Sequence, residues 1–116
     1  MYTLVTNNPL VKAQYQSELK IKYLDADLLG ILTHIRDLVH KGHKLLTHPL
    51  SGSLKPNESP YKSVLLSDNT EKTDPQSVSI IEESILTAQK FPTKHIPEKH
   101  LYDLQTIDLA LIQSAL

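Results

Sequence analysis

Residues 2–11, YTLVTNNPLV, predict a buried strand that turns directly into a helix. The segment begins with short, apolar and β-branched side chains, which favour a strand inside a sheet. Asn8 can cap the helix with its side-chain oxygen. Pro9 fits the first helical position, because its missing N–H would have no helical partner there. The opening of the chain therefore indicates an α/β domain.

The clearest helix is expected over residues 27–41, where six aliphatic side chains recur at three- and four-residue spacing. Asp25 or Asp27 can cap its start, and Gly42 is placed to end it in the left-handed conformation. A third helix is expected from Asp74-Pro75 to about residue 90. A last helix, from Pro97 to the C-terminus, is expected to turn five apolar side chains inward: Leu101, Leu104, Leu111, Ile112 and Ala115.

Three further strands are expected, in LKIKYL (19–24), KLLT (44–47) and KSVLLS (62–67). Strands that alternate with helices are typical of a parallel sheet with helices packed on its faces. The expectation is one small three-layer α/β domain, residues 1–116, with a mainly parallel sheet of about four strands. Ligands of such sheets bind beyond the carboxyl ends of the strands. The loops after the first and third strands should therefore lie side by side.

Composition excludes several functional classes. The 12 basic and 13 acidic side chains give a net charge of −1, so no overall field attracts nucleic acid or an anionic membrane. The chain has no cysteine, which excludes thiolate nucleophiles, zinc–thiolate sites and iron–sulfur ligation. No signal peptide is recognisable, and no apolar run approaches the ~20 residues that span a bilayer. A cytoplasmic location without cofactor or metal is expected.

The long polar tract THPLSGSLKPNESPYKS, residues 47–63, is the expected site of function. Loops of this length in small domains commonly bind ligands, and lysines beside a helix start suit an anion. The alternative is a structural loop whose Ser and Asn side chains bond its own backbone. The candidate ligand-binding residues are Thr6, Asn7, Asn8, Thr47, His48, Ser51, Gly52, Ser53, Lys55, Asn57 and Lys62.

His48 is the best candidate for proton transfer, because it follows an expected strand and histidine titrates near neutrality. Glu58 could orient it if the loop folds back. The favoured alternative is a histidine that orders the loop through a backbone hydrogen bond. His34 and His40 are expected on a solvated helix face. The other three histidines lack a metal-ligand spacing: His43, His95 and His100.

Asp108 stands in the middle of the apolar stripe of the last helix. A carboxylate at such a position needs a hydrogen-bonding or charged partner. It could reach toward the loop site, bond a helix start or a backbone turn, or fix the register of a homodimer. The second of these is favoured.

Three stretches resemble the GrdX family: VTNNPLV near the start, GHKLLTHPLSGSLKPNESPYKSV in the middle and DLQTIDLALIQSAL at the end. The resemblance covers most of the chain. Proteins of this family are small and are encoded beside glycine, sarcosine or betaine reductase systems of amino-acid-fermenting bacteria. The resemblance implies this context, but it implies no activity and no catalytic residues. Those reductases produce acetyl phosphate, which adds interest to an anion site.

Three functions remain open. The first is an accessory or binding protein that recognises a small anionic metabolite or a reductase-system protein. The alternative is a small enzyme of acyl transfer, phosphoryl transfer or hydrolysis, with His48 as general base and residues 51–53 as the anion cradle. An assembly factor would instead expose an apolar patch, most plausibly on the last helix.

Overall fold

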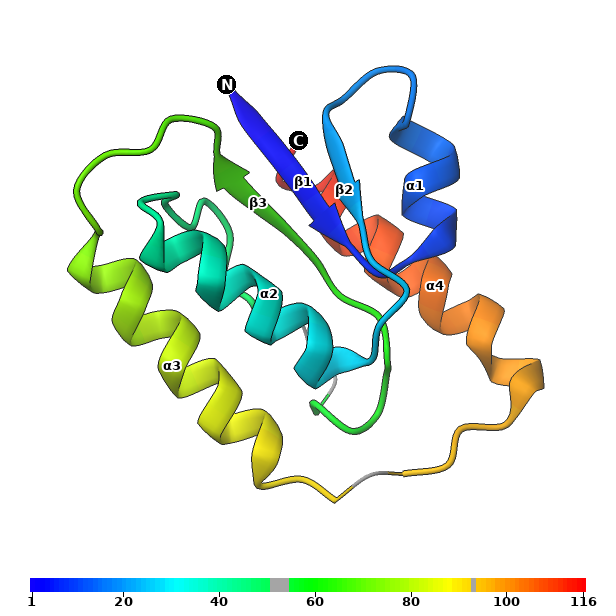
Figure 1. The fold of residues 1–116 in the computed structure, drawn as a ribbon. Helices are drawn as coiled ribbons and strands as arrows, with labels where there is room; N and C mark the ends of the chain where they lie inside the picture. Colours follow the sequence, from blue (N-terminus) through cyan, green and yellow to red (C-terminus); the bar gives the residue numbers. More distant parts are fainter. Residues whose placement is uncertain (51–54, 93) are drawn as a thin grey trace.

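The structure, a computed structural model, describes residues 1–50, 55–92 and 94–116 (Figure 1). Its helices and strands confirm the predicted α/β class. They follow in the order β1 (Tyr2–Thr6), α1 (Pro9–Tyr15), β2 (Ile21–Tyr23), α2 (Leu28–His40), β3 (Ser63–Ser67), α3 (Pro75–Gln89) and α4 (Glu98–Gln113).

The sheet has three strands in the order β2-β1-β3, not the predicted four. β1 runs parallel to β2 and antiparallel to β3, with Thr6 opposite Ser63. The expectation of a mainly parallel sheet is therefore corrected to a mixed one. This topology places the end of β1 beside the start of β3, so polar residues at both positions meet.

Residues 44–47, predicted as a strand, lie beside β3 without forming a full one. The Ser67 N–H bonds the Lys44 carbonyl, and the Leu46 N–H bonds the Leu65 carbonyl. The Leu65 N–H then donates to the Thr47 side-chain oxygen at 3.0 Å. Because a hydroxyl takes the place of the next backbone acceptor, the ladder ends there. Only the bridge between Leu45 and Leu66 remains.

Helices cover both faces of the sheet, giving the three layers that were expected (Figure 1). On one face, α2 and α3 pack around Val5, Val64 and Leu66. On the other, Val11 of α1 and Ile112 of α4 pack on Leu4 and Leu65. Alternation of side chains along the central strands explains this division, because neighbouring residues point to opposite faces.

The predicted starts of α1, α2 and α3 are confirmed, whereas α4 runs from Glu98 to Gln113 and ends before the C-terminus. The side chains of Asn8, Asp27 and Asp74 accept N–H groups at the starts of α1, α2 and α3. Gly42 follows α2 with a φ of 109°, and a Cβ there would lie 2.3 Å from the Glu71 carbonyl oxygen. A side chain is therefore excluded by backbone strain and by close approach.

The predicted inward face of α4 is only partly right. Ile112 is buried, and Leu101 and Leu104 are half-buried. Leu111 is 38% exposed and Ala115 is also exposed. The helix packs closely through the side that bears Asp108 and Ile112, while Leu104 and Leu111 face a cleft.

Candidate functional site

A chain of buried hydrogen bonds joins the end of β1, the start of β3 and α4. The Asn8 N–H donates to Thr6 Oγ1 at 3.0 Å, and Thr6 Oγ1 lies 2.7 Å from Ser63 Oγ. Ser63 Oγ donates to Asp108 Oδ2 at 2.7 Å. Since Ser63 uses its proton on Asp108, Thr6 must donate to Ser63. All the protons in this chain therefore point toward the Asp108 carboxylate.

Asn7 and Asn8 are both occupied by structural bonds. The Asn7 side-chain amide donates to the carbonyls of Ala26 and Pro60, and its oxygen accepts the Lys62 N–H at 2.8 Å. Asn8 caps α1 and donates to the Gln105 carbonyl and to Asp108 Oδ2. The end of β1 and residues 60–62 thus lie side by side, as expected. The expected reason was different, however. Residues 60–62 precede β3, which is antiparallel to β1, whereas a loop that follows a parallel strand was expected there.

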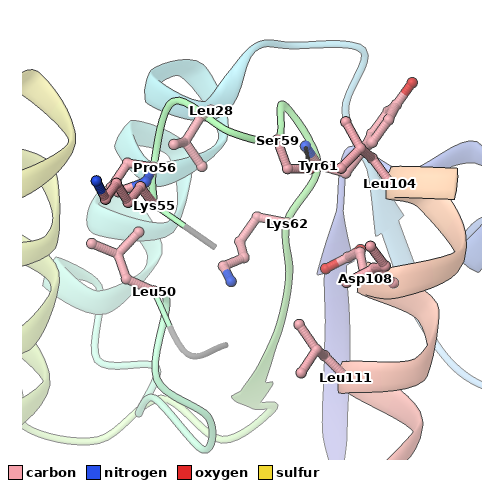
Figure 2. Close-up of a pocket in the computed structure, with 11 residues that line it drawn as sticks. Leu28, Leu50, Lys55, Pro56, Ser59, Tyr61, Lys62, Leu104, Asp108 and Leu111 are labelled. Atoms are coloured by element: carbon pink, nitrogen blue, oxygen red, sulfur yellow. Dashed lines mark hydrogen bonds between the residues drawn. The ribbon is translucent and has the colours of Figure 1, made fainter. Parts of the chain in front are cut away.

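Two adjoining cavities between α4 and the stretch leading into β3 form a cleft, and Lys62, Asp108 and Leu111 line both cavities. Figure 2 shows Lys62 reaching between Leu50 on one side and the α4 residues on the other, with the Asp108 carboxylate pointing toward it from α4. The remaining lining at this end is mostly apolar, with Leu28, Leu104 and Leu111 among the wall residues. A charged amine therefore lies in a poorly solvated setting.

Burial lowers the pKa of Lys62 from its ordinary 10.5, and the charge of Asp108 opposes that shift. Desolvation penalises the ammonium form, while a nearby negative charge favours it. The structure thus holds a cation where its free energy is raised.

The cleft continues to a wider end where Thr47 and His48 face the last turn of α4. The cavity volume there is about 280 Å³, against about 30 Å³ at the end beside Leu28. His48 Nδ1 accepts the Leu50 N–H at 3.0 Å, which is the loop-ordering role favoured above. Glu58 accepts the Lys55 N–H instead of orienting His48.

The remaining candidates from the loop are dispersed. Lys55 is exposed at the narrow end of the cleft, and the Asn57 side chain donates to the Pro92 carbonyl. Ser51, Gly52 and Ser53 lie outside the described residues. The structure therefore gathers Thr47, His48 and Lys62 at the cleft.

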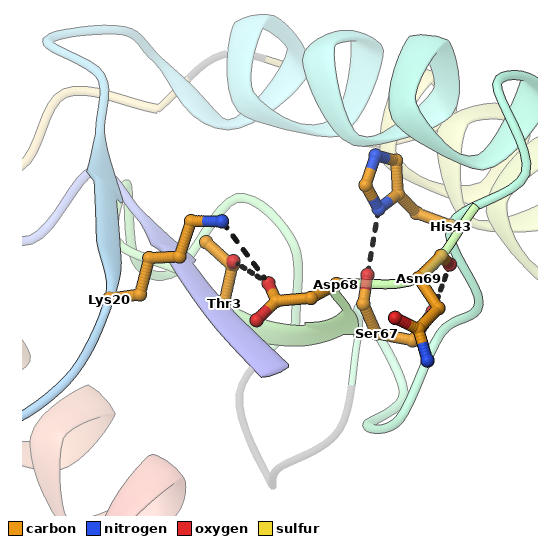
Figure 3. Close-up of polar contacts among 6 residues, drawn as sticks. All are labelled: Thr3, Lys20, His43, Ser67, Asp68 and Asn69. Atoms are coloured by element: carbon orange, nitrogen blue, oxygen red, sulfur yellow. Dashed lines mark hydrogen bonds and ion pairs between the residues drawn. The ribbon is translucent and has the colours of Figure 1, made fainter. Parts of the chain in front are cut away.

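The opposite end of the sheet is polar but exposed (Figure 3). Asp68 accepts the Thr3 hydroxyl and lies 3.6 Å from Lys20 Nζ, and these contacts lower the pKa of Asp68. His43 Nδ1 lies 2.7 Å from the Ser67 carbonyl oxygen. These side chains join the strand ends, and none of them lines the cleft beside α4.

His34 corrects the expectation of a solvated side chain. Its Nε2 is buried without a hydrogen-bond partner among the described residues. Burial, and then the charge of Lys22, lower the pKa of His34. His40 is exposed, as expected, 3.3 Å from Glu82. Within the ranges that the structure describes, no three His, Asp or Glu side chains gather as a metal site.

Sequence reasoning missed Ser63 and the α4 wall of the cleft. Ser63 looked like an ordinary strand residue, and its role depends on the antiparallel pairing with β1. Asp108 did carry a signal, since it interrupts an apolar stripe. Two of the alternatives given for Asp108 apply together. It bonds the N-cap residue of α1, and it also lines the cleft.

Comparison with known proteins gives one match. A family model described as GrdX-like protein matches residues 3–116, nearly the whole chain. No curated protein and no solved structure matches. Among the described residues, no helix combines the length and apolar character needed to cross a membrane.

Proposed function

We propose that this chain, which belongs to the GrdX-like protein family, is an accessory protein that binds a small anionic ligand in the cleft beside α4. The observation that carries the proposal is the half-buried Lys62 amine among mainly apolar walls. An anionic group bound beside this ammonium group would favour its charged form, because an opposite charge counteracts the desolvation of a partly buried cation.

The wider end of the cleft supports a small ligand. Thr47 and His48 add polar groups beside Lys62, and the 280 Å³ cavity is smaller than that of a drug-sized site. The Lys62 backbone is held by Asn7, so the base of this side chain is fixed before a ligand arrives. Such preorganisation reduces the ordering cost of binding.

Thermal unfolding in the presence of phosphate, acetyl phosphate, carboxylates, amino acids and nucleotides tests the proposal. A ligand at a hundred times its dissociation constant stabilises a protein by ~2.7 kcal/mol, a shift of several degrees in a small domain. We expect at least one of these compounds to stabilise the wild type. Lys62→Met should abolish the shift, because it removes the ammonium group. Methionine keeps most of the unbranched apolar part of the side chain.

Lys72→Met provides the matched control, because Lys72 is exposed and lies outside the cleft. This variant should keep the full ligand shift. An equal loss in both variants would mean that overall charge, and not the cleft, determines binding. No shift with any compound would overturn the proposal for these ligand classes.

A small enzyme of acyl transfer, phosphoryl transfer or hydrolysis is the second candidate, favoured by the position of His48 in the same cleft as Lys62. With Nδ1 accepting the Leu50 N–H, the proton of a neutral His48 is on Nε2. Proton abstraction at Nδ1 would require this bond to break. Turnover of a stabilising ligand, lost in His48→Gln while binding persists, would establish the enzyme. Binding without turnover would support the accessory role.

The family context also motivates a partner protein from a glycine, sarcosine or betaine reductase system, in the cytoplasm. The supporting observation is the set of exposed apolar side chains on α4, which includes Tyr102, Ile107 and Leu111. Co-purification with such a reductase from a native extract, lost in Tyr102→Ser, tests this. A homodimer in size-exclusion chromatography would assign the same surface to a second copy.

A further inference from the structure

Two side chains of opposite charge, Lys62 and Asp108, line the cleft. Lys62 and Asp108 both line its narrow and its wide end. Their charges interact, since Asp108 favours the ammonium form of Lys62. An anionic group that binds Lys62 also lies in the field of Asp108, so a ligand that carries a cationic group as well should bind better than one that carries the anionic group alone.

The hydrogen bonds around Asp108 fix it as an acceptor. Asn8 Nδ2 and Ser63 Oγ both donate to Oδ2, at 3.0 and 2.7 Å. Two donors thus hold Oδ2, and Asp108 reaches the cleft from α4 (Figure 2). A carboxylate has about four lone-pair sites, so Oδ1 retains capacity for a donor on a ligand.

The walls between these charges are apolar on the α4 side. Leu111 borders both ends of the cleft, and Ile112 and Ala115 extend the wall at the wide end. Leu111 is 38% exposed, so part of its side chain is open to contact. Covering this wall with an apolar group of a ligand would contribute favourable burial.

We propose that the ligand of this cleft is a zwitterion of the α-amino acid class with a small apolar side chain. Its carboxylate faces Lys62, its ammonium group faces Asp108, and its side chain lies on Leu111. This inference rests on the proposed binding function of the same cleft and specifies its ligand class. A zwitterion offers a group of opposite sign to each of the two charged side chains that line the cleft.

The test uses matched compounds in isothermal titration calorimetry. L-Alanine, L-valine and L-leucine are each compared with the carboxylate that lacks the amino group and with the amide that lacks the carboxylate. At least one amino acid should bind the wild type ten or more times more tightly than both of its analogues. Lys62→Met should lose this preference over the amide.

Asp108→Asn supplies the sharper readout, because its amide oxygen can still accept from Asn8 and Ser63 while the charge is gone. Binding should then shift toward the carboxylate without an amino group, reversing the wild-type order. A purely structural role for Asp108 would weaken all compounds equally and would overturn the inference.

The two proposals fail in different ways. If phosphate or plain carboxylates bind in a Lys62-dependent manner as tightly as the amino acids, the anion site stands and the zwitterion inference falls. If an amino acid binds equally to wild type and Lys62→Met, both fail for this cleft. If no compound binds at all, both fail together.

Discussion

The two faces of the sheet are built on different principles. Under α2 and α3, ten apolar residues form one buried cluster, including Ile31, Leu32 and Ile35 without solvent contact. Under α1 and α4, the buried apolar cluster of the described residues has four members. Beside it, buried hydrogen bonds link Asn8, Thr6, Ser63 and Asp108. The polar face carries the cleft that Lys62 and Asp108 line.

This difference separates stability from chemistry within one small domain. Apolar burial is the dominant favourable contribution to folding, so the α2/α3 face should determine how stable the protein is. Buried polar groups contribute less net stability but specify geometry, because each must keep its partner. The α1/α4 face therefore holds groups in place for binding at some expense of stability.

The largest effect is expected from Ile35→Ala on the apolar face. Ile35 has no exposed surface, and truncation of such a side chain leaves a cavity that typically costs ~2–5 kcal/mol. Urea unfolding should show a lower midpoint with an unchanged slope. Ile107→Ala, at a position 41% exposed on the other side, should cost less than about 1 kcal/mol. Equal losses would contradict the division between the faces.

The next effect is expected from Asp108→Ala, which breaks the polar closure. Ser63 Oγ and one bond of Asn8 Nδ2 would lose their acceptor inside the protein, at a cost of ~1–3 kcal/mol. Asp108→Asn keeps an acceptor oxygen and should lose less. Urea unfolding of both variants gives the comparison. An alanine variant as stable as the wild type would mean that this network contributes nothing to the fold.

Lys62→Met should change stability in the opposite direction. The folded pKa of Lys62 is lowered by burial, so the unfolded chain binds the proton more tightly. The resulting penalty is complete below the folded pKa, is relieved as pH rises through it, and vanishes above the unfolded value near 10.5. The methionine variant should therefore be more stable at neutral pH, with the advantage fading in alkali. Thermal unfolding across this pH range checks the sign, and a destabilised variant at neutral pH would refute it.

The sequence predicts the helices of both faces better than it predicts the sheet. Helix signals are local: Asn8 caps α1 as expected, and Asp27, one of two candidates, caps α2. Asp74 caps the helix that was expected to begin there, and Gly42 follows the end of α2. Strand pairing depends on partners far along the chain. Residues 44–47 have a strand-like composition, but the hydroxyl of Thr47 takes over a ladder position of β3.

The candidate site could be predicted only in part for the same reason. Lys62 and His48 were found because they lie in a long polar tract, and Asp108 because it interrupts an apolar stripe. Ser63 could not be found, because its role arises from the register that sets it opposite Thr6. The α4 wall was assigned to the core, since periodicity marks an apolar stripe without telling which part of it the sheet covers.

The smallest effect is expected from Asp74→Asn, and it gives the apolar face a pH signature opposite to that of Lys62. The hydroxyl and the N–H of Ser77 both donate to Asp74 and lower its pKa below the ordinary 3.8. The folded state thus favours the carboxylate, whose stabilising contribution is present above the unfolded pKa and is lost as pH falls through the folded one. Asparagine can still cap α3 but cannot titrate, so acid unfolding should lose part of its pH dependence. The rest should persist, because Asp68 has a lowered pKa for a similar reason.

Glu83→Gln, at an exposed position in α3, controls for the loss of one negative charge. If Asp74→Asn and Glu83→Gln change the loss of stability at low pH equally, the Asp74 cap does not cause that loss. The stability of the α2/α3 face then rests on apolar packing alone.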